Sequence, residues 1–80
     1  MDDSELLSEI HRLVDHEHRL RQRATGTELP EADQRRLQEI EVALDQCWDL
    51  LRQRRAKREV GANPDEADVR DPGTVEGYRQ

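Results

Sequence analysis

Two stretches of this sequence place apolar residues at alternating spacings of three and four positions. Because a helix turns once in about 3.6 residues, such spacings put these side chains along one helix face. The sequence therefore predicts two helices, each with a single apolar face, which we call the seam. The predicted seam residues are Leu6, Ile10, Leu13, Glu17, Leu20, Leu37, Ile40, Leu44, Cys47, Trp48 and Leu51.

Residues typical of helix ends border the first stretch. Asp3 or Ser4 can cap its start, because a short side-chain oxygen accepts hydrogen bonds from the first unpaired amides. Gly26 can adopt the left-handed conformation that often ends a helix. We expect the first helix over about residues 4–24.

The second stretch predicts a longer helix, over about residues 30–60. Pro30 suits its first turn, where a missing N–H has no helical partner, and Gly61 can end it. The short connection between the helices favours antiparallel packing. Both helices begin with acidic residues and end with basic ones, so antiparallel packing also sets opposite charges side by side. Residues 1–60 are thus predicted to form an antiparallel helical hairpin.

Residues 61–80 form an acidic tail without apolar periodicity. The letters NPDE resemble a helix start, so the tail allows a short helix over residues 64–70. Pro72 and Gly73 are typical of a type II turn. Tyr78, the only tyrosine, is a candidate partner contact because amphipathic rings anchor many interfaces. Docking of the tail on the hairpin, capture of a partner and disorder all remain open.

The composition excludes several classes of function. The chain has 80 residues, of which 40% are charged and 32% hydrophobic, and a net charge of −6, so nucleic-acid binding is not expected. No apolar run approaches ~20 residues, which argues against a membrane span. The acidic start does not resemble a signal peptide, and a cytoplasmic protein is expected. The single Cys47 excludes an intrachain disulfide and a cysteine-built zinc site.

A two-helix hairpin has little surface against which to bury its apolar residues. Small domains bury a low fraction of their surface, and a common remedy is a twofold dimer of hairpins. We therefore expect an all-α homodimer that forms a four-helix bundle with an irregular C-terminal tail. The predicted dimer contacts are Leu6, Ile10, Leu13, Leu44, Cys47 and Leu51.

The most distinctive stretch lies in the second predicted helix and reads LDQCWDLLRQRRA, residues 44–56. Together with LVDHEHRLR before it and VEGY near the end, it resembles a small actinobacterial family known as domain of unknown function 2630. The resemblance covers nearly the whole chain. It implies a soluble bacterial protein and supplies no catalytic residue or cofactor.

A looser similarity connects LQEIEVALDQCWDLLRQR with the first helix of all-helical chorismate mutases. Those enzymes hold a dicarboxylate between arginines and a lysine. Here Lys57 is the only lysine, and the sequence predicts no third long helix. An enzyme is therefore not expected.

The stretch VDHEH contains two histidines around a glutamate. His16 and His18 are two positions apart and cannot share a metal on a helix. His11 and His18 share a face with Asp15, and these three are the candidates for a weak zinc or nickel site. The competing interpretation is a solvated outer face, because a closed site needs further ligands and an oriented second shell. We expect no bound metal or cofactor.

Glu17 falls within the seam, where an unpaired carboxylate is costly. Arg21, one turn on, or Arg36 across the hairpin is expected to pair with it. A charge pair that fixes the register is favoured over a catalytic carboxylate.

Three acids of the second helix, Glu41, Asp45 and Asp49, are spaced by four. They predict a solvated acidic stripe, with Asp49 paired to Arg52. The basic end of this helix, residues 52–58, could contact phosphate, although the helix dipole also explains it.

The leading functional hypothesis is a non-enzymatic interaction or scaffold module. The alternative is a small-ligand or metal-binding helical dimer that uses His11, Asp15 and His18, or the basic end. A helical hairpin is consistent with both, because fold alone does not determine function.

Overall fold

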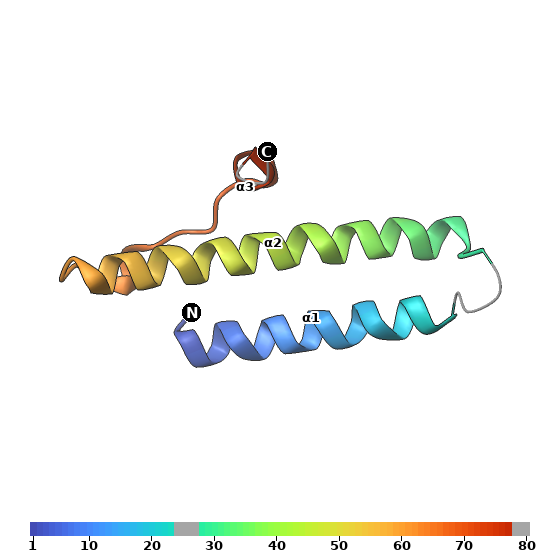
Figure 1. The fold of residues 1–80 in the computed structure, drawn as a ribbon, viewed down its shortest axis with the longest axis horizontal. Helices are drawn as coiled ribbons and strands as arrows, with labels where there is room; N and C mark the ends of the chain where they lie inside the picture. Colours follow the sequence, from blue (N-terminus) through green and yellow to red (C-terminus); the bar gives the residue numbers. More distant parts are fainter. Residues whose placement is uncertain (24–27, 78–80) are drawn as a thin grey trace.

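The computed structural model describes residues 1–23 and 28–77, and within them every regular element is a helix. The elements are α1 (Asp3–Arg23), α2 (Glu31–Glu59), a single 3-10 turn η1 (Pro64–Glu66) and α3 (Pro72–Gly77). α1 and α2 lie side by side and antiparallel (Figure 1). The prediction of an all-α hairpin is confirmed. The predicted helix end at Gly26 and the candidate contact Tyr78 lie outside the described residues.

The start of α1 is capped one residue earlier than predicted. The Asp2 carboxylate accepts a hydrogen bond from the Glu5 backbone N–H at 2.8 Å, and the Glu5 carboxylate accepts one from the Asp2 N–H at 3.4 Å. This is a reciprocal capping box, which satisfies two otherwise unpaired amides. Because Asp2 caps the helix, the Asp3 carboxylate is available for contacts with α2.

The end of α2 is a Schellman motif centred on Gly61. The Ala62 N–H donates to the Lys57 carbonyl at 2.7 Å, and the Gly61 N–H donates to the Arg58 carbonyl at 3.1 Å. Gly61 has a φ of 77°, in the left-handed region that this motif requires. The motif turns the chain away from the helix axis and starts the tail.

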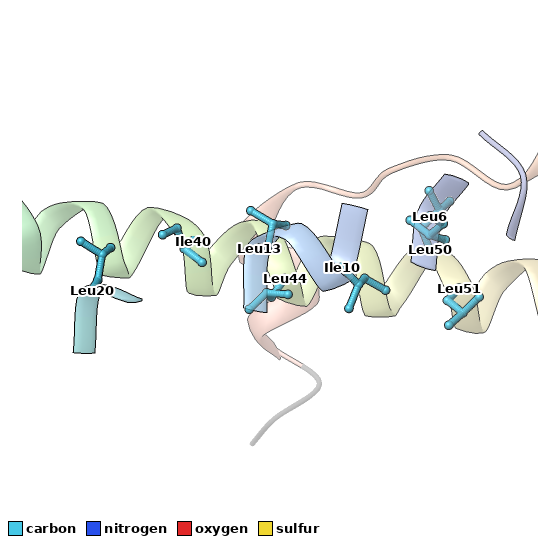
Figure 2. Packing of buried hydrophobic residues seen from close by; sticks show 8 residues of the cluster. All are labelled: Leu6, Ile10, Leu13, Leu20, Ile40, Leu44, Leu50 and Leu51. Atoms are coloured by element: carbon cyan, nitrogen blue, oxygen red, sulfur yellow. The ribbon is translucent and has the colours of Figure 1, made fainter. Parts of the chain in front are cut away.

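The core of the hairpin consists of leucine and isoleucine side chains from both helices. Figure 2 shows Leu13 beside Leu44 and Leu6 beside Leu50 within one cluster. The half-buried Leu37 and Cys47 lie at its edge. The buried cluster comprises Leu6, Ile10, Leu13, Leu20, Ile40, Leu44, Leu50 and Leu51.

The tail returns along α2 on the side opposite α1 (Figure 1). Of the short helix allowed over residues 64–70, only the turn of η1 forms, and Asn63 caps it by accepting from the Asp65 N–H at 3.0 Å. The predicted type II turn at Pro72 and Gly73 is wrong, because Pro72 instead begins α3. Proline is favoured at a first helical position, since its φ is already helical.

The molecule is a single layer of helices. Its dimensions are 50 × 26 × 16 Å, and its radius of gyration is 15.0 Å. A compact chain of this length would have a radius of gyration of about 12 Å. Most domains bury their apolar faces between two packed layers. Here α1, α2 and the tail lie beside one another in one layer, which leaves both broad faces open.

Candidate interaction surfaces

The tail is held on α2 by a buried carboxylate. The Asp49 side chain lies on the outer face of α2 and the residue is only 1% exposed. The Arg70 guanidinium donates to both of its oxygens, at 2.9 Å from Nε and 2.8 Å from Nη2. Gln53 Nε2 donates a further hydrogen bond to Asp49 at 2.9 Å. These charge-assisted bonds offset the cost of removing the carboxylate from water.

Two glutamines of the same face hold the tail by its backbone. Gln53 Nε2 also donates to the Asp68 carbonyl at 2.8 Å, and Gln46 Nε2 donates to the Arg70 carbonyl at 3.2 Å. Gln46, Asp49 and Gln53 are spaced by three and four, so they lie along one stripe of α2. For the described part of the tail, the structure shows docking on the hairpin.

This docking corrects two predictions about the acidic stripe. Asp49 pairs with Arg70 from the tail and not with Arg52. Two of the three acids of the stripe, Asp45 and Asp49, are buried, whereas Glu41 is half-exposed. The prediction failed because it treated the outer face of α2 as open to water, whereas the tail covers it.

A second ion-pair cluster joins three segments at one end of the hairpin. The Asp3 carboxylate of α1 accepts from Arg54 Nε at 2.6 Å and from Arg58. Arg54 also donates to Asp65 of η1 at 3.0 Å. Hydrogen bonds from Arg58 and Arg54 lower the pKa of Asp3 from 3.8 to about 2. Part of the basic end, residues 52–58, therefore has a structural role.

Glu17 and Glu41 share an arginine between α1 and α2. Arg21 Nη2 lies 3.5 Å from the Glu17 carboxylate and 3.0 Å from that of Glu41. The expected pairing of Glu17 with Arg21 is therefore present. Arg36, the other predicted partner, pairs with Glu39 at 3.2 Å. Glu17 is half-buried, so its burial cost is smaller than the seam position suggested.

Three large apolar side chains lie exposed on α1 and α2. Leu7 is 37% exposed, Val14 is 44% exposed and Trp48 is 45% exposed. Leu7 and Val14 belong to one stripe with Arg21, and Trp48 belongs to one stripe with Glu41, because residues seven apart share a helix face. The Arg21–Glu41 pair joins the two stripes on the same side of the hairpin. We call Leu7, Val14 and Trp48 the apolar flank.

The apolar flank is distinct from the other exposed apolar residues. Met1, Val60 and Val69 are also exposed, but they lie outside α1 and α2. Beside Trp48 is a shallow hollow lined by Leu44 and by polar residues. The hollow is formed by Glu17, Glu41, Leu44, Asp45 and Trp48.

Basic residues line a second shallow hollow on α1. It is formed by Arg12, His16, Arg19, Leu20 and Arg23. Two of its arginines pair with acids of the same helix, Arg12 with Glu9 and Arg19 with Asp15. Pairing within the helix lowers the charge that this surface presents to a ligand.

The candidate metal ligands lie on the exposed outer face of α1. Asp15 pairs with Arg19 at 3.1 Å, and His18 Nε2 lies 3.1 Å from Gln22 Nε2. Within residues 1–23 and 28–77, no three His, Cys, Asp or Glu side chains cluster as metal ligands would. The structure therefore does not bring His11, Asp15 and His18 together with a further ligand.

Cys47 is half-buried at the edge of the core. Burial and the nearby Glu9 carboxylate raise the pKa of its thiol. A protonated thiol is a poor nucleophile, which favours a packing role. Among the described residues, no helix has the length and apolarity needed to cross a bilayer.

Residues 2–80 match the family described as "Protein of unknown function (DUF2630)". The chain belongs to this family. Its membership confirms the resemblance inferred from motifs in both helices and the tail, and the match spans the hairpin and the tail alike.

Three similar proteins come from mycobacteria. An uncharacterized protein of Mycobacterium bovis and uncharacterized proteins of two strains of Mycobacterium tuberculosis are each 51% identical over 77 residues. The aligned region covers 95% of this chain and 88% of each relative. No solved structure matches the chain. Function must therefore be argued from the geometry of these surfaces.

Proposed function

We propose that the chain is a non-enzymatic helical interaction module that acts as a homodimer, with two hairpins forming a four-helix bundle. The observation that carries the proposal is the apolar flank. Leu7, Val14 and Trp48 are exposed on helices whose seam is already filled within one chain. Exposed apolar patches framed by polar residues are typical of protein contact sites.

The single-layer shape supports the same proposal. A second hairpin packed on the apolar flank would supply the missing layer. The face of α1 and α2 is about 32 Å long and about 20 Å wide, or about 600 Å². Stable interfaces bury about 800 Å² from each partner, so the available face is of the right order.

The proposed dimer surface differs from the one predicted from the sequence, because most of the predicted contact residues lie elsewhere in the hairpin. Leu6, Ile10, Leu13 and Leu51 are buried between α1 and α2 of one chain. Leu44 remains relevant because it lines the hollow beside Trp48. We therefore place the partner on the apolar flank.

The ligand-binding alternative has less support. His11, Asp15 and His18 are exposed without a converging fourth ligand among the described residues, and Arg54 and Arg58 are engaged by Asp3. A cytoplasmic location is part of the proposal, since a lone thiol such as Cys47 is stable in a reducing compartment.

The test is the mass of the protein in solution, measured by light scattering over a range of concentrations. We expect a dimer mass that falls on dilution, with a red shift of tryptophan emission as Trp48 becomes exposed to water. Trp48→Gln should shift the equilibrium to monomer, whereas Val60→Gln, at a position that is 80% exposed outside the flank, should not. A monomer mass at every concentration would contradict the proposal.

A further inference from the structure

We infer that the two copies pack antiparallel, with the twofold axis beside Trp48, so that Glu41 faces the partner subunit's Arg55. This inference rests on the proposed homodimer and specifies its geometry. The occupant of the apolar flank is thus a second copy of this chain, in one defined orientation.

The stripe of α2 that contains Trp48 is complementary to itself. Glu41, Trp48 and Arg55 are spaced by seven, so they lie on one side of α2 with an acid and a base at equal distances from the tryptophan. A twofold axis perpendicular to α2 at Trp48 sets each residue opposite the one equally far on the other side. It therefore brings Glu41 to the partner subunit's Arg55 twice. A parallel arrangement would instead oppose like charges, which disfavours it.

The apolar residues of α1 lie on both sides of the same axis. Since Leu13 lies beside Leu44 and Leu6 beside Leu50 (Figure 2), Trp48 is level with the segment of α1 between them. Leu7 and Val14 lie near the two ends of that segment. Leu7 and Val14 therefore lie on opposite sides of the axis at Trp48, and with Trp48 they face the apolar residues of the partner subunit. The interface gains an apolar centre and charged ends, as in stable protein contacts.

Arg55 differs from the neighbouring arginines of α2 in its contacts. Its neighbours one position before and three positions after, Arg54 and Arg58, both bind Asp3. Arg55 is exposed, and residues 1–23 and 28–77 offer it no ion pair or hydrogen bond. Among the described residues, Glu41 pairs with Arg21 alone, and it remains half-exposed. Exposed charge pairs add little affinity, but they do select the orientation of an interface.

The experiment is cross-linking between single cysteine variants made in the Cys47→Ser background, which keeps Trp48 intact. Glu41→Cys and Arg55→Cys are mixed as full-length proteins and treated with a short bismaleimide, and the products are identified by mass. We expect the mixed product, with little of either homodimeric product. Val60→Cys is the matched control and should give no product at the same concentration.

A charge reversal provides an independent measurement. Arg55→Glu should weaken the dimer about tenfold at low salt, because two complementary pairs become repulsive. Arg35→Glu is the control, since Arg35 is also an exposed arginine but lies near the start of α2, far from the proposed axis.

The outcomes separate this inference from the proposed function. A dimer mass with the mixed product supports both. A dimer mass with homodimeric products, or with no product at these positions, overturns the antiparallel geometry and leaves the homodimer standing. A monomer mass throughout overturns both.

Discussion

At the scale of single residues, Asp49 determines whether the tail stays on α2. Replacing Arg70 by Met leaves a buried carboxylate with one glutamine donor, and loss of one partner of a buried pair costs about 3 kcal/mol. Because the tail can lift off and admit water, we expect the loss to appear mainly as tail release. Hydrogen exchange should show faster exchange of the amides of residues 67–70, with the amides of α1 little changed.

A double variant tests whether Asp49 and Arg70 stabilise the docked tail as a pair or only through separate packing contacts. Asp49→Leu with Arg70→Met should cost less than the sum of the two single changes, because it removes both charges together. Val69→Ala is the control, since Val69 is exposed beside Arg70. Additive effects would show that Asp49 and Arg70 are not coupled.

Asp3 should make stability depend on pH in the acid range. Its pKa is about 2 in the folded chain and 3.8 otherwise, so folding favours the charged form. The stabilisation is complete above about pH 4 and is lost as the pH falls through about 2. Asp3→Asn should reduce the unfolding free energy at neutral pH and flatten its change between pH 4 and 2. Urea unfolding at several pH values measures this, with Asp15→Asn at an exposed position as the control.

Of these polar contacts, the sequence could predict the pairs within one helix but not the pairs between distant segments. The pairing of Glu17 with Arg21 was predictable because the two residues are one helical turn apart. The pairing of Asp49 with Arg70 joins residues 21 positions apart, and no helical spacing predicts it. The available signal was an arginine in an acidic tail, together with an acid on the face of α2 opposite the seam.

At the scale of elements, the Schellman motif at Gly61 sets the direction in which the tail leaves α2. Gly61→Ala should reduce the unfolding free energy by about 1 kcal/mol, because a Cβ disfavours the left-handed conformation. No atom within 4 Å would meet that Cβ, so the cost lies in the backbone alone. Gly61→Asn should cost less, since asparagine tolerates this conformation. Equal stabilities of all three proteins in urea unfolding would contradict this role.

The hairpin should not need the tail in order to fold. A chain ending at Gly61 exposes Asp49 to water, keeps the Asp3–Arg54 pair and removes Ala67 from the edge of the apolar cluster, while the eight buried residues of α1 and α2 remain. We expect its circular dichroism to show the helix content of α1 and α2, with cooperative unfolding. Loss of that signal would make the tail part of the folding core.

The two long helices were predictable from sequence, and the course of the tail was not. Periodic apolar residues and end signals placed α1 and α2 close to their observed bounds. Pro72 and Gly73 fit either a turn or a helix start, and the choice depends on contacts with α2 that are distant in sequence. Val75 is buried in α3 although no local pattern marks it.

At the scale of the whole molecule, the helices form one layer, so the apolar side chains have little surface against which to pack. The sequence indicated this shape through its small apolar fraction, but it could not locate the exposed apolar surface. A heptad face can pack on the neighbouring helix of its own chain or on another chain, and the spacing is the same in both cases. Here the seam is used within the hairpin, which leaves Leu7, Val14 and Trp48 outside.

If the second layer comes from another copy, folding and association should be linked. Each tenfold rise in protein concentration then favours the folded dimer by about 1.4 kcal/mol. For a dimer of two 80-residue chains, the midpoint of thermal unfolding should rise by roughly 3–6 °C for each tenfold rise in protein concentration. Trp48→Gln should lower the midpoint and remove this dependence, whereas Val60→Gln should keep both. A wild-type midpoint that does not change over a hundredfold range would mean that one layer is stable by itself, and that the apolar flank contributes nothing to folding.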